Sequence, residues 1–211
     1  KNTNLYEEST PFSINQNFNY YHTLSETNIF ALEAQYLISD EDPFYNAILF
    51  NDPQNNDNLD NDAFDSTAEE LGLNRNLSSY NLGQKRRVKS NQLDAKLDYY
   101  NILNSKSNLN LTLGAIVSRQ EFNSQFFQFL DNDNQFIPTP TSIDLDGNLL
   151  ETNNDTEYNF SDVYLGFHYR VRLGKFTITP GFSVHAYGNK NTQFDNTYKD
   201  NFLRLLPDLE T

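Results

Sequence analysis

One acidic segment has the clearest spacing of metal-ligating residues in the chain. Asp144-Leu145-Asp146-Gly147-Asn148 begins as the calcium-binding loop of an EF-hand does, in which alternate side-chain oxygens reach one Ca²⁺ ion. An EF-hand also needs a glutamate at its last ligand position and a helix on each side. The corresponding residue here is Asp155, and the flanking residues lack helical periodicity. A hairpin turn at Asp146-Gly147 inside a long loop therefore explains the segment better.

Other acidic residues and the histidines offer weaker candidates for a metal site. The acidic residues lie in polar stretches, where weak binding of surface Ca²⁺ is the alternative to a solvated loop. They are Asp57, Asp60, Asp62 and Asp65, and likewise Asp131 and Asp133. The histidines are His22, His168 and His185; the last two fall on one face of a predicted hairpin without being directly opposite. We therefore expect no metal site and no cofactor.

Lys85, Arg86, Arg87 and Lys89 form the one basic cluster in the sequence. At the outer end of a strand this cluster would meet the phosphates of lipopolysaccharide, whereas the alternative is a solvated strand end or a lumen wall. The chain has no cysteine, no serine in a recognisable nucleophile setting and no phosphate-binding glycine loop. We therefore expect that it is not an enzyme, and the sequence assigns no ligand-binding residue.

The composition favours a membrane β-barrel over a compact soluble core. The 211 residues carry a net charge of −14, with a pI of about 4.4, which opposes binding to nucleic acid. Aromatic residues make up 14%, yet the mean hydropathy is −0.71, as expected where apolar and polar residues alternate and loops are wet. No apolar run is long enough for a membrane helix. The chain lacks methionine and begins with Lys1, so we expect an internal piece or a processed product.

Asp162–Tyr187 has the strongest strand pattern in the sequence. Apolar residues alternate with polar ones on both sides of Gly174-Lys175, which is typical of strands with one apolar face. A two-residue turn that begins with glycine suits a tight hairpin, and pairing Leu173 with Phe176 places apolar residues opposite each other throughout. The residues expected to face lipid include Val163, Leu165, Phe167, Tyr169, Val171, Ile178, Phe182 and Val184. The other face would line a wet lumen.

The remaining sequence repeats this design. Hairpins are predicted over about residues 11–39, 87–118 and 160–187, and long loops over about 40–79, 119–159 and 188–201. The first loop contains a possible helix over Ser66–Leu73, with Ser66 as its cap. Short turns alternate with long loops, as the periplasmic turns and extracellular loops of outer-membrane barrels do. We predict an all-β fold, an antiparallel meander of about six to seven long strands forming one partial barrel domain over residues 1–211; further strands would be needed to close the barrel.

Two segments add a resemblance to a known family. Gln35-Tyr36-Leu37-Ile38-Ser39-Asp40-Glu41-Asp42-Pro43-Phe44-Tyr45-Asn46 resembles a strand-to-loop segment of TonB-dependent outer-membrane receptors of Bacteroidota, the carboxypeptidase-regulatory-like/outer-membrane beta-barrel family. Leu203-Arg204-Leu205-Leu206-Pro207-Asp208-Leu209 is similar to a Leu-Leu-Pro-x-Leu element that leads into a barrel strand of these receptors. The resemblance covers essentially the whole chain, as part of the barrel half of such a receptor.

This resemblance implies a location in the cell outer membrane and the transport of a scarce ligand. The family's barrel has about 22 strands around a plug, and uptake of an iron chelate, a glycan or a peptide is energised through TonB. The plug and the TonB-contacting segment have no match in this chain, so they would belong to parts of the protein that are not present here. Outer-membrane lipid and lipopolysaccharide would surround the barrel.

Two other classes of protein remain as alternatives. One is a plugless outer-membrane barrel that serves as a channel or an adhesin. The other is a soluble secreted β-protein that binds glycan through its acidic loops. Dependence on detergent would separate the soluble protein from both barrels.

Overall fold

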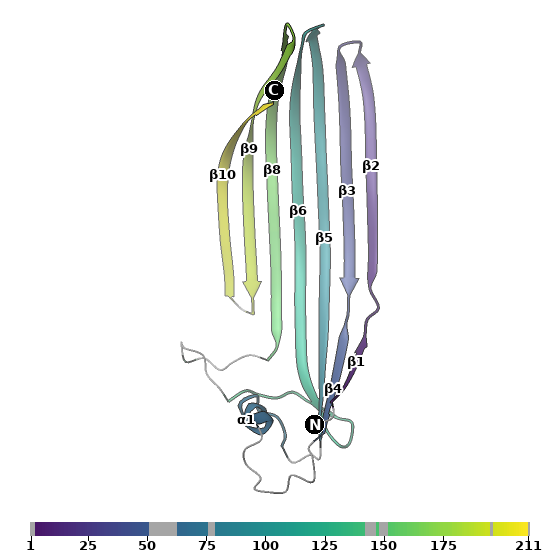
Figure 1. Ribbon diagram of the computed structural model, residues 1–211, viewed down its shortest axis with the longest axis vertical. Helices are drawn as coiled ribbons and strands as arrows, with labels where there is room; N and C mark the ends of the chain where they lie inside the picture. The colour runs from purple at the N-terminus through teal and green to yellow at the C-terminus, as the bar shows by residue number, and fades with distance from the viewer. Residues whose placement is uncertain are drawn as a thin grey trace. The chain divides into compact units, whose positions relative to one another are not determined.

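The strands pair into one antiparallel sheet in the computed structural model, which describes residues 3–50, 63–75, 79–141, 147, 152–194 and 196–210 (Figure 1). The strands are β1 (Thr3–Glu8), β2 (Phe12–Ser25), β3 (Asn28–Glu41), β4 (Phe44–Phe50), β5 (Ser79–Asn104), β6 (Ser107–Phe129), β7 (Gln135–Phe136), β8 (Asn154–Leu173), β9 (Phe176–Gln193) and β10 (Asn196–Glu210). The one helix among the described residues is α1 (Ala63–Glu70). The predicted all-β class and antiparallel pairing are confirmed.

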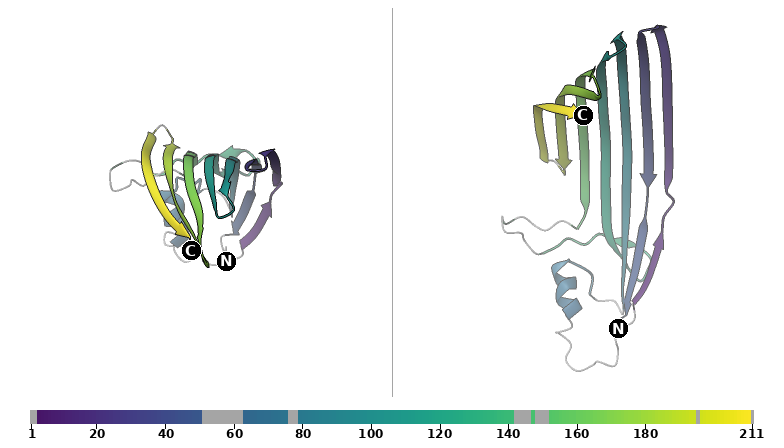
Figure 2. Two further views of the ribbon diagram at one scale, coloured as in Figure 1. Left: turned by 90° about the horizontal axis from the view of Figure 1, so that it is seen from above. Right: turned by 45° about the horizontal axis from the view of Figure 1, so that its top comes forward.

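The strand order follows the chain with few departures. Paired strands run in the order β1-β4-β5-β6-β8-β9-β10, and in addition β2 pairs with β3, β3 with β5, and β7 with β6. Within the described residues, β2 pairs only with β3 and β10 only with β9, so the sheet does not close on itself. The neighbouring strands β8, β9 and β10 lie side by side in every view (Figures 1 and 2).

The chain divides into two compact units, which are considered separately below. The first unit comprises Lys1–Phe12, Asp40–Val88 and Phe122–Thr156. The second unit comprises Ser13–Ser39, Lys89–Glu121 and Glu157–Thr211.

The hairpin predicted around Gly174-Lys175 is present in the second unit. β8 ends at Leu173 and β9 begins at Phe176, and Gly174 has a φ of 65°, which only glycine adopts at little cost. Side-chain contacts agree with the predicted register. The rings of Phe167 and Phe182 have centroids 5.5 Å apart, and a Cβ added to Gly181 would meet the ring of His168.

The three predicted long loops are all shorter in the structure. β3 extends to Glu41 and β4 covers Phe44–Phe50, while β6 extends to Phe129 and β8 begins at Asn154. The prediction of a loop over 188–201 was wrong, because β9 and β10 pair across this segment. Its residues are polar at nearly every position, so the alternation that marks a strand with one apolar face is missing. Backbone pairing does not require that alternation, and the strands continue through it.

The helix in the first unit begins and ends earlier than predicted. α1 starts at Ala63, so Ser66 lies inside the helix and not at its cap. The helix ends because Gly72 adopts a φ of 71°. The backbone N–H of Leu73 then bonds to the carbonyl of Ala68 at 2.8 Å, and that of Gly72 to the carbonyl of Glu69 at 3.0 Å. This hydrogen-bond pair is the Schellman motif that closes many helices.

Candidate functional site

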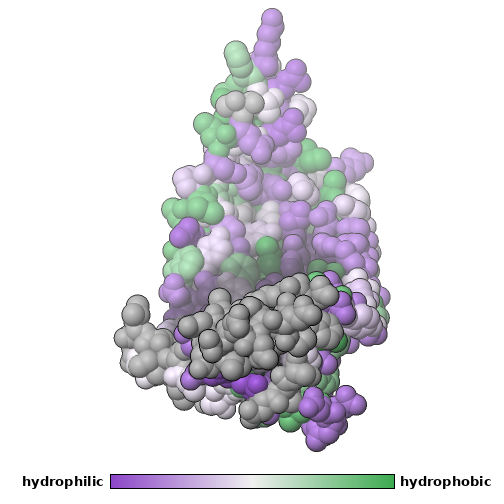
Figure 3. Space-filling model, turned by 60° about the horizontal axis from the view of Figure 1, so that its bottom comes forward, coloured by the Kyte–Doolittle hydropathy of each residue, from purple (hydrophilic) through white to green (hydrophobic). Residues whose placement is uncertain are grey.

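The second unit carries an exposed apolar face on β8 and β9. Val163, Leu165, Phe182 and Val184, all predicted to face lipid, are exposed. The other members of that set, Phe167, Tyr169, Val171 and Ile178, are half-buried on the same strands. Hydrophobic side chains stand among hydrophilic ones at the surface in Figure 3. The alternation in the sequence therefore corresponds to real differences in exposure.

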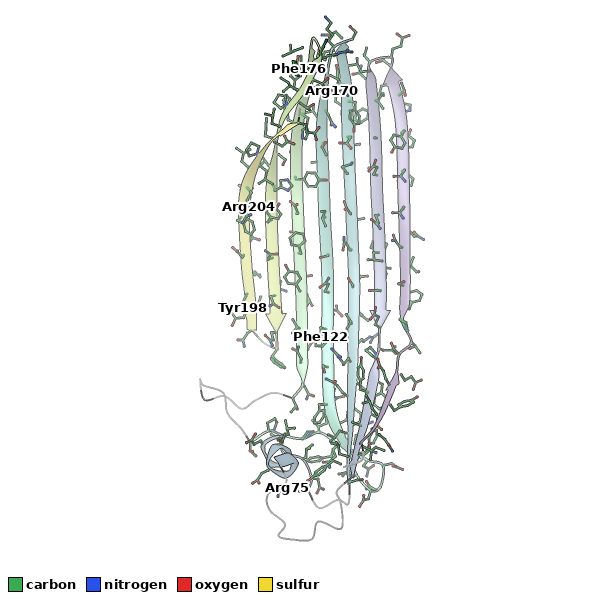
Figure 4. All side chains as sticks on the ribbon, viewed as in Figure 1. Arg75, Phe122, Arg170, Phe176, Tyr198 and Arg204 are labelled. Carbon is green, nitrogen blue, oxygen red and sulfur yellow. The ribbon has the colours of Figure 1, made fainter. Side chains whose placement is uncertain are left out.

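β10 extends this apolar face. Leu203 lies opposite Ala186 and Leu205 lies opposite Val184 in the register with β9. Leu203 and Leu205 are 74% and 65% exposed. Successive side chains of a strand point to opposite faces of a sheet. Arg204, which lies between these two leucines on β10 (Figure 4), is therefore on the other face.

The opposite face of the second unit buries polar groups instead. The hydroxyl of Thr112 donates a hydrogen bond of 2.5 Å to Asp98, which is only 3% exposed. The Nζ of Lys96 lies 3.2 Å from the same carboxylate and 3.3 Å from that of Glu33. These groups satisfy one another, as buried polar groups must. A soluble sheet with one wet face has the reverse arrangement, apolar side chains inside and polar ones outside.

His185 lies at the centre of a second polar cluster on this face. Its Nδ1 is 2.9 Å from both carboxylate oxygens of Asp162, and its Nε2 is 3.0 Å from the hydroxyl of Ser183. Its ring stacks on Tyr164 and on Tyr187, with centroids 4.9 and 5.4 Å away. The sequence prediction did not identify this cluster. The predicted register already placed His185 opposite Tyr164. Asp162 is then the diagonal neighbour of His185 on the facing strand, and this position could have predicted the contact between them.

His168 belongs to a separate pair. Its Nε2 lies 2.8 Å from a carboxylate oxygen of Asp208 on β10. The pair crosses β9 above Gly181, where a Cβ would meet both side chains. His168 and His185 are thus engaged by different aspartates, and His22 stacks on Tyr20. In the part of the chain that the structure describes, no group of three or more histidine and acidic side chains is placed to hold a metal ion.

The members of the basic cluster have different partners. In the first unit, Arg87 forms a two-contact ion pair with Asp40, at 3.0 and 3.2 Å. The guanidinium of Arg86 lies 5.5 and 5.6 Å from the ring centroids of Tyr45 and Phe122, and Lys85 lies over another aromatic ring. The fourth member, Lys89, falls in the second unit. Successive residues of one strand point to opposite faces, which explains why adjacent cations have different partners.

A pocket of 430 Å³ lies in the first unit beside this cluster. Its walls include Lys85, Arg86 and Arg87 of the cluster, together with Glu8, Thr10, Asp42 and Phe44. Asp42 accepts hydrogen bonds of 2.6 and 3.3 Å from the hydroxyl and backbone N–H of Thr10. The pocket therefore combines cationic and acidic side chains with an aromatic ring.

The predicted acidic sites have different outcomes. Asp131 and Asp133 lie in the β6–β7 turn. Asp133 has a φ of 59°, and its backbone N–H donates a hydrogen bond to the carbonyl of Leu130, so this residue helps to form the turn. Asp65 lies in α1, and Asp155 lies at the start of β8. Asp57, Asp60, Asp62, Asp144 and Asp146 lie outside the described residues, so the proposed calcium loop stays a prediction.

Arg119 and Glu157 form an exposed ion pair in the second unit, before the apolar part of β8. Their nearest atoms are 2.9 Å apart, and Arg119 also lies 2.7 Å from Glu121. A hydrogen bond from Asn159 and the charge of Arg119 hold the pKa of Glu157 below its usual value. The carboxylate is therefore the stable form of Glu157 down to a lower pH than usual.

Comparisons with known proteins do not assign this chain to a family. No protein-family model matches it, and no curated protein matches it. The helix that the structure describes is too short and too polar to cross a membrane.

Proposed function

We propose that the chain is part of the wall of a transmembrane β-barrel in the outer membrane. The observation that carries this proposal is the reversed partition in the second unit, where leucines of β10 are exposed and Asp98 and Asp162 are buried. In lipid, outward apolar side chains are favoured, and polar groups must find partners on the other face. Antiparallel hairpins with short turns at one end support the same proposal.

We further propose that this barrel is a TonB-dependent receptor of Bacteroidota that takes up an iron chelate, a glycan or a peptide. This step rests on the resemblance of Gln35–Asn46 and Leu203–Leu209 to that family. The plug and the TonB-contacting segment would lie elsewhere in the polypeptide. The wall would contact outer-membrane lipid and lipopolysaccharide, and the negative net charge does not suit nucleic acid.

Two adjacent leucines allow a matched test of the membrane orientation. Leu205 and Leu206 are both exposed, but successive residues of a strand point to opposite faces. Leu205→Arg should cost about 2–4 kcal/mol near the middle of the bilayer, and Leu206→Arg, on the polar face, should be tolerated. The measurement is the amount of each full-length variant in the outer-membrane fraction, with heat-dependent gel mobility as the check on barrel formation.

Equal tolerance of the two arginines would contradict the orientation. Solubility of the full-length protein without detergent would favour the secreted β-protein instead. The receptor step has its own test, because uptake should stop when TonB is deleted. Passive ion flux through liposomes, independent of TonB, would favour a plugless channel.

A further inference from the structure

We propose that Ser183, His185 and Asp162 form a nucleophilic relay that cleaves carboxylic esters on the polar face of the β8–β9 hairpin. The three side chains make one continuous line of hydrogen bonds, from the Ser183 hydroxyl through the imidazole to the carboxylate. The proposal goes beyond uptake, which requires no catalytic group in the barrel wall.

The distances fix the role of each group. The Asp162 carboxylate, 2.9 Å from Nδ1 of His185 through both oxygens, accepts the Nδ1–H hydrogen bond and so sets the tautomer. Nε2 is then left as an acceptor, and the Ser183 hydroxyl at 3.0 Å donates to it. An imidazole positioned in this way is a general base for serine. Asp162 is 6% exposed, so water competes little for its carboxylate.

The imidazole is held in place by its neighbours. Tyr164 from β8 and Tyr187 from β9 stack on the ring of His185 with interplanar angles of 16° and 11°. Both tyrosines and Ser183 lie on paired strands and not on loops. A general base on a rigid element keeps the geometry that proton transfer needs.

The side chains around Ser183 can be placed from the register. Gly181 precedes Ser183 on the same face of β9, and the register observed through the Gly181–His168 contact places Gly166 opposite Ser183 on β8. Leu206 of β10 is paired with Ser183 on the other side, and His168 and Asp208 lie over Gly181. Ser183 is half-buried, which leaves it within reach of a small substrate.

Arg204 is the candidate donor for the oxyanion. Its Cα is paired with that of His185 across β9 and β10, so the two side chains share a face. The guanidinium lies 5.0 Å from the centroid of the Phe202 ring. Phe202 and the Leu206 that is paired with Ser183 flank Arg204 on this face, so the guanidinium would have to turn from Phe202 toward Leu206 to donate to a developing negative charge at Ser183.

The reaction needs only the ester and water. The Ser183 oxygen attacks the ester carbonyl carbon as its proton passes to Nε2 of His185, and the carbonyl π electrons move to the carbonyl oxygen. When the carbonyl re-forms, the carbon–oxygen bond to the alcohol breaks, and that alcohol takes the proton from Nε2. A water molecule then gives its proton to Nε2 and attacks the acyl-serine. The carboxylic acid leaves, and Ser183 regains its proton.

The surroundings favour an ester of a polyhydroxylated alcohol, such as an acylated sugar. A pocket of 260 Å³ is lined by Tyr164 and by amide, acidic and ammonium groups, including Asn17, Asn19, Gln35 and Lys96. These groups donate to and accept from hydroxyl groups. No residue of the relay lines this pocket, and Tyr164, which stacks on His185, is the link between the two. The relay lies on the face opposite Leu203 and Leu205, so, if the proposed membrane orientation holds, the acyl chains of phospholipids do not reach it.

The test uses the full-length protein in outer-membrane vesicles. A fluorophosphonate probe should label Ser183, as located by peptide mass spectrometry, and p-nitrophenyl acetate should be hydrolysed faster than p-nitrophenyl palmitate. Ser183→Ala should abolish both signals, and His185→Gln should lower both by about 100-fold or more. Asp162→Asn should shift the pH–rate profile, which a purely structural role would not do. Ser161→Ala is the matched control, since Ser161 has only a long 3.5 Å hydrogen bond to a backbone carbonyl.

Heat-dependent gel mobility distinguishes a variant that fails to fold from a folded variant that has lost labelling and hydrolysis. Ser183→Cys retains a nucleophile and should still be labelled by a thiol-reactive probe. A folded protein whose Ser183 is not labelled, or a Ser183→Ala variant with an unchanged rate, overturns the relay. Faster hydrolysis of the palmitate ester overturns the substrate class. Labelling of Ser183 does not depend on whether Leu205→Arg is tolerated in the membrane. The relay can therefore be contradicted while the barrel proposal stands, and the reverse.

Discussion

The first and second units differ in the side chains that they mostly bury, because most of the buried apolar residues lie in the first unit and most of the buried polar ones in the second. In the first unit, Tyr80 is 1% exposed and packs with Ala68 and Leu73. In the second unit, Leu203 is exposed while Asp98 is buried. Burial of apolar area stabilises a fold only where the alternative is contact with water. The difference is the one expected if, as proposed, the second unit has a less polar surrounding on one face and the first unit lies in water.

Truncation of one large apolar residue in each unit should have very unequal effects. Tyr80→Ala in the first unit should cost about 3–5 kcal/mol, because it leaves a cavity beside α1. Leu203→Ala in the second unit removes a side chain that few protein atoms cover, and its effect should be small. Denaturant unfolding of the full-length protein in detergent, with limited proteolysis near α1, measures both. Comparable losses would remove the distinction between the units.

The strands of the second unit could be predicted because their surroundings differ on the two faces. Alternating exposure makes the period of two visible in the sequence, and Gly174-Lys175 fixes the turn. The register that follows from these residues agrees with the contacts of Phe167 and Gly181. Apolar patterning and one turn therefore sufficed for this hairpin.

Other features could not be predicted for equally physical reasons. Polar strands such as those across 188–201 show no periodicity, so only their backbone pairing reveals them. The end of α1 depends on Gly72 adopting a left-handed conformation against the backbone of Thr139. The Ser183–His185–Asp162 line needs the exact rotamers of three side chains, which a pattern of residue types does not specify.

The buried polar face of the second unit can be tested through Asp98. Asp98→Leu removes the acceptor for Thr112 and one partner of Lys96, and we expect a loss of about 1–3 kcal/mol in unfolding free energy. Asp98→Asn keeps an acceptor and should lose less. If water reached this face freely, as it reaches the outside of the first unit, both substitutions would be nearly neutral in the same unfolding assay.

Two glycines distinguish packing in the first unit from backbone strain in the second. A Cβ on Gly83 would meet the buried ring of Phe127, so Gly83→Ala should cost about 1–3 kcal/mol and be partly rescued by Phe127→Leu.

A Cβ on Gly174 meets nothing within 4 Å, but its φ of 65° makes Gly174→Ala cost about 1–2 kcal/mol. Gly174→Asn should lose less, because asparagine tolerates this conformation. Rescue of Gly174→Ala by a neighbouring side-chain substitution would contradict the backbone explanation.

The smallest effect is expected at Arg119, where the second unit carries an ordinary exposed ion pair. Arg119→Gln should change the unfolding free energy by less than about 1 kcal/mol, because water screens the pair with Glu157. The lowered pKa of Glu157 means that its contribution is present above the usual pKa of a glutamate and is lost as the pH falls through the lowered value. The difference between Arg119→Gln and the unsubstituted protein should therefore vanish in acid.

Asn159→Ala should matter more than Arg119→Gln, because the hydrogen bond from Asn159 is the larger cause of that shift. A large, pH-independent effect of Arg119→Gln would mean that this end of β8 is shielded from water, and the boundary of the proposed lipid-facing surface would then lie closer to Glu157 than to Val163.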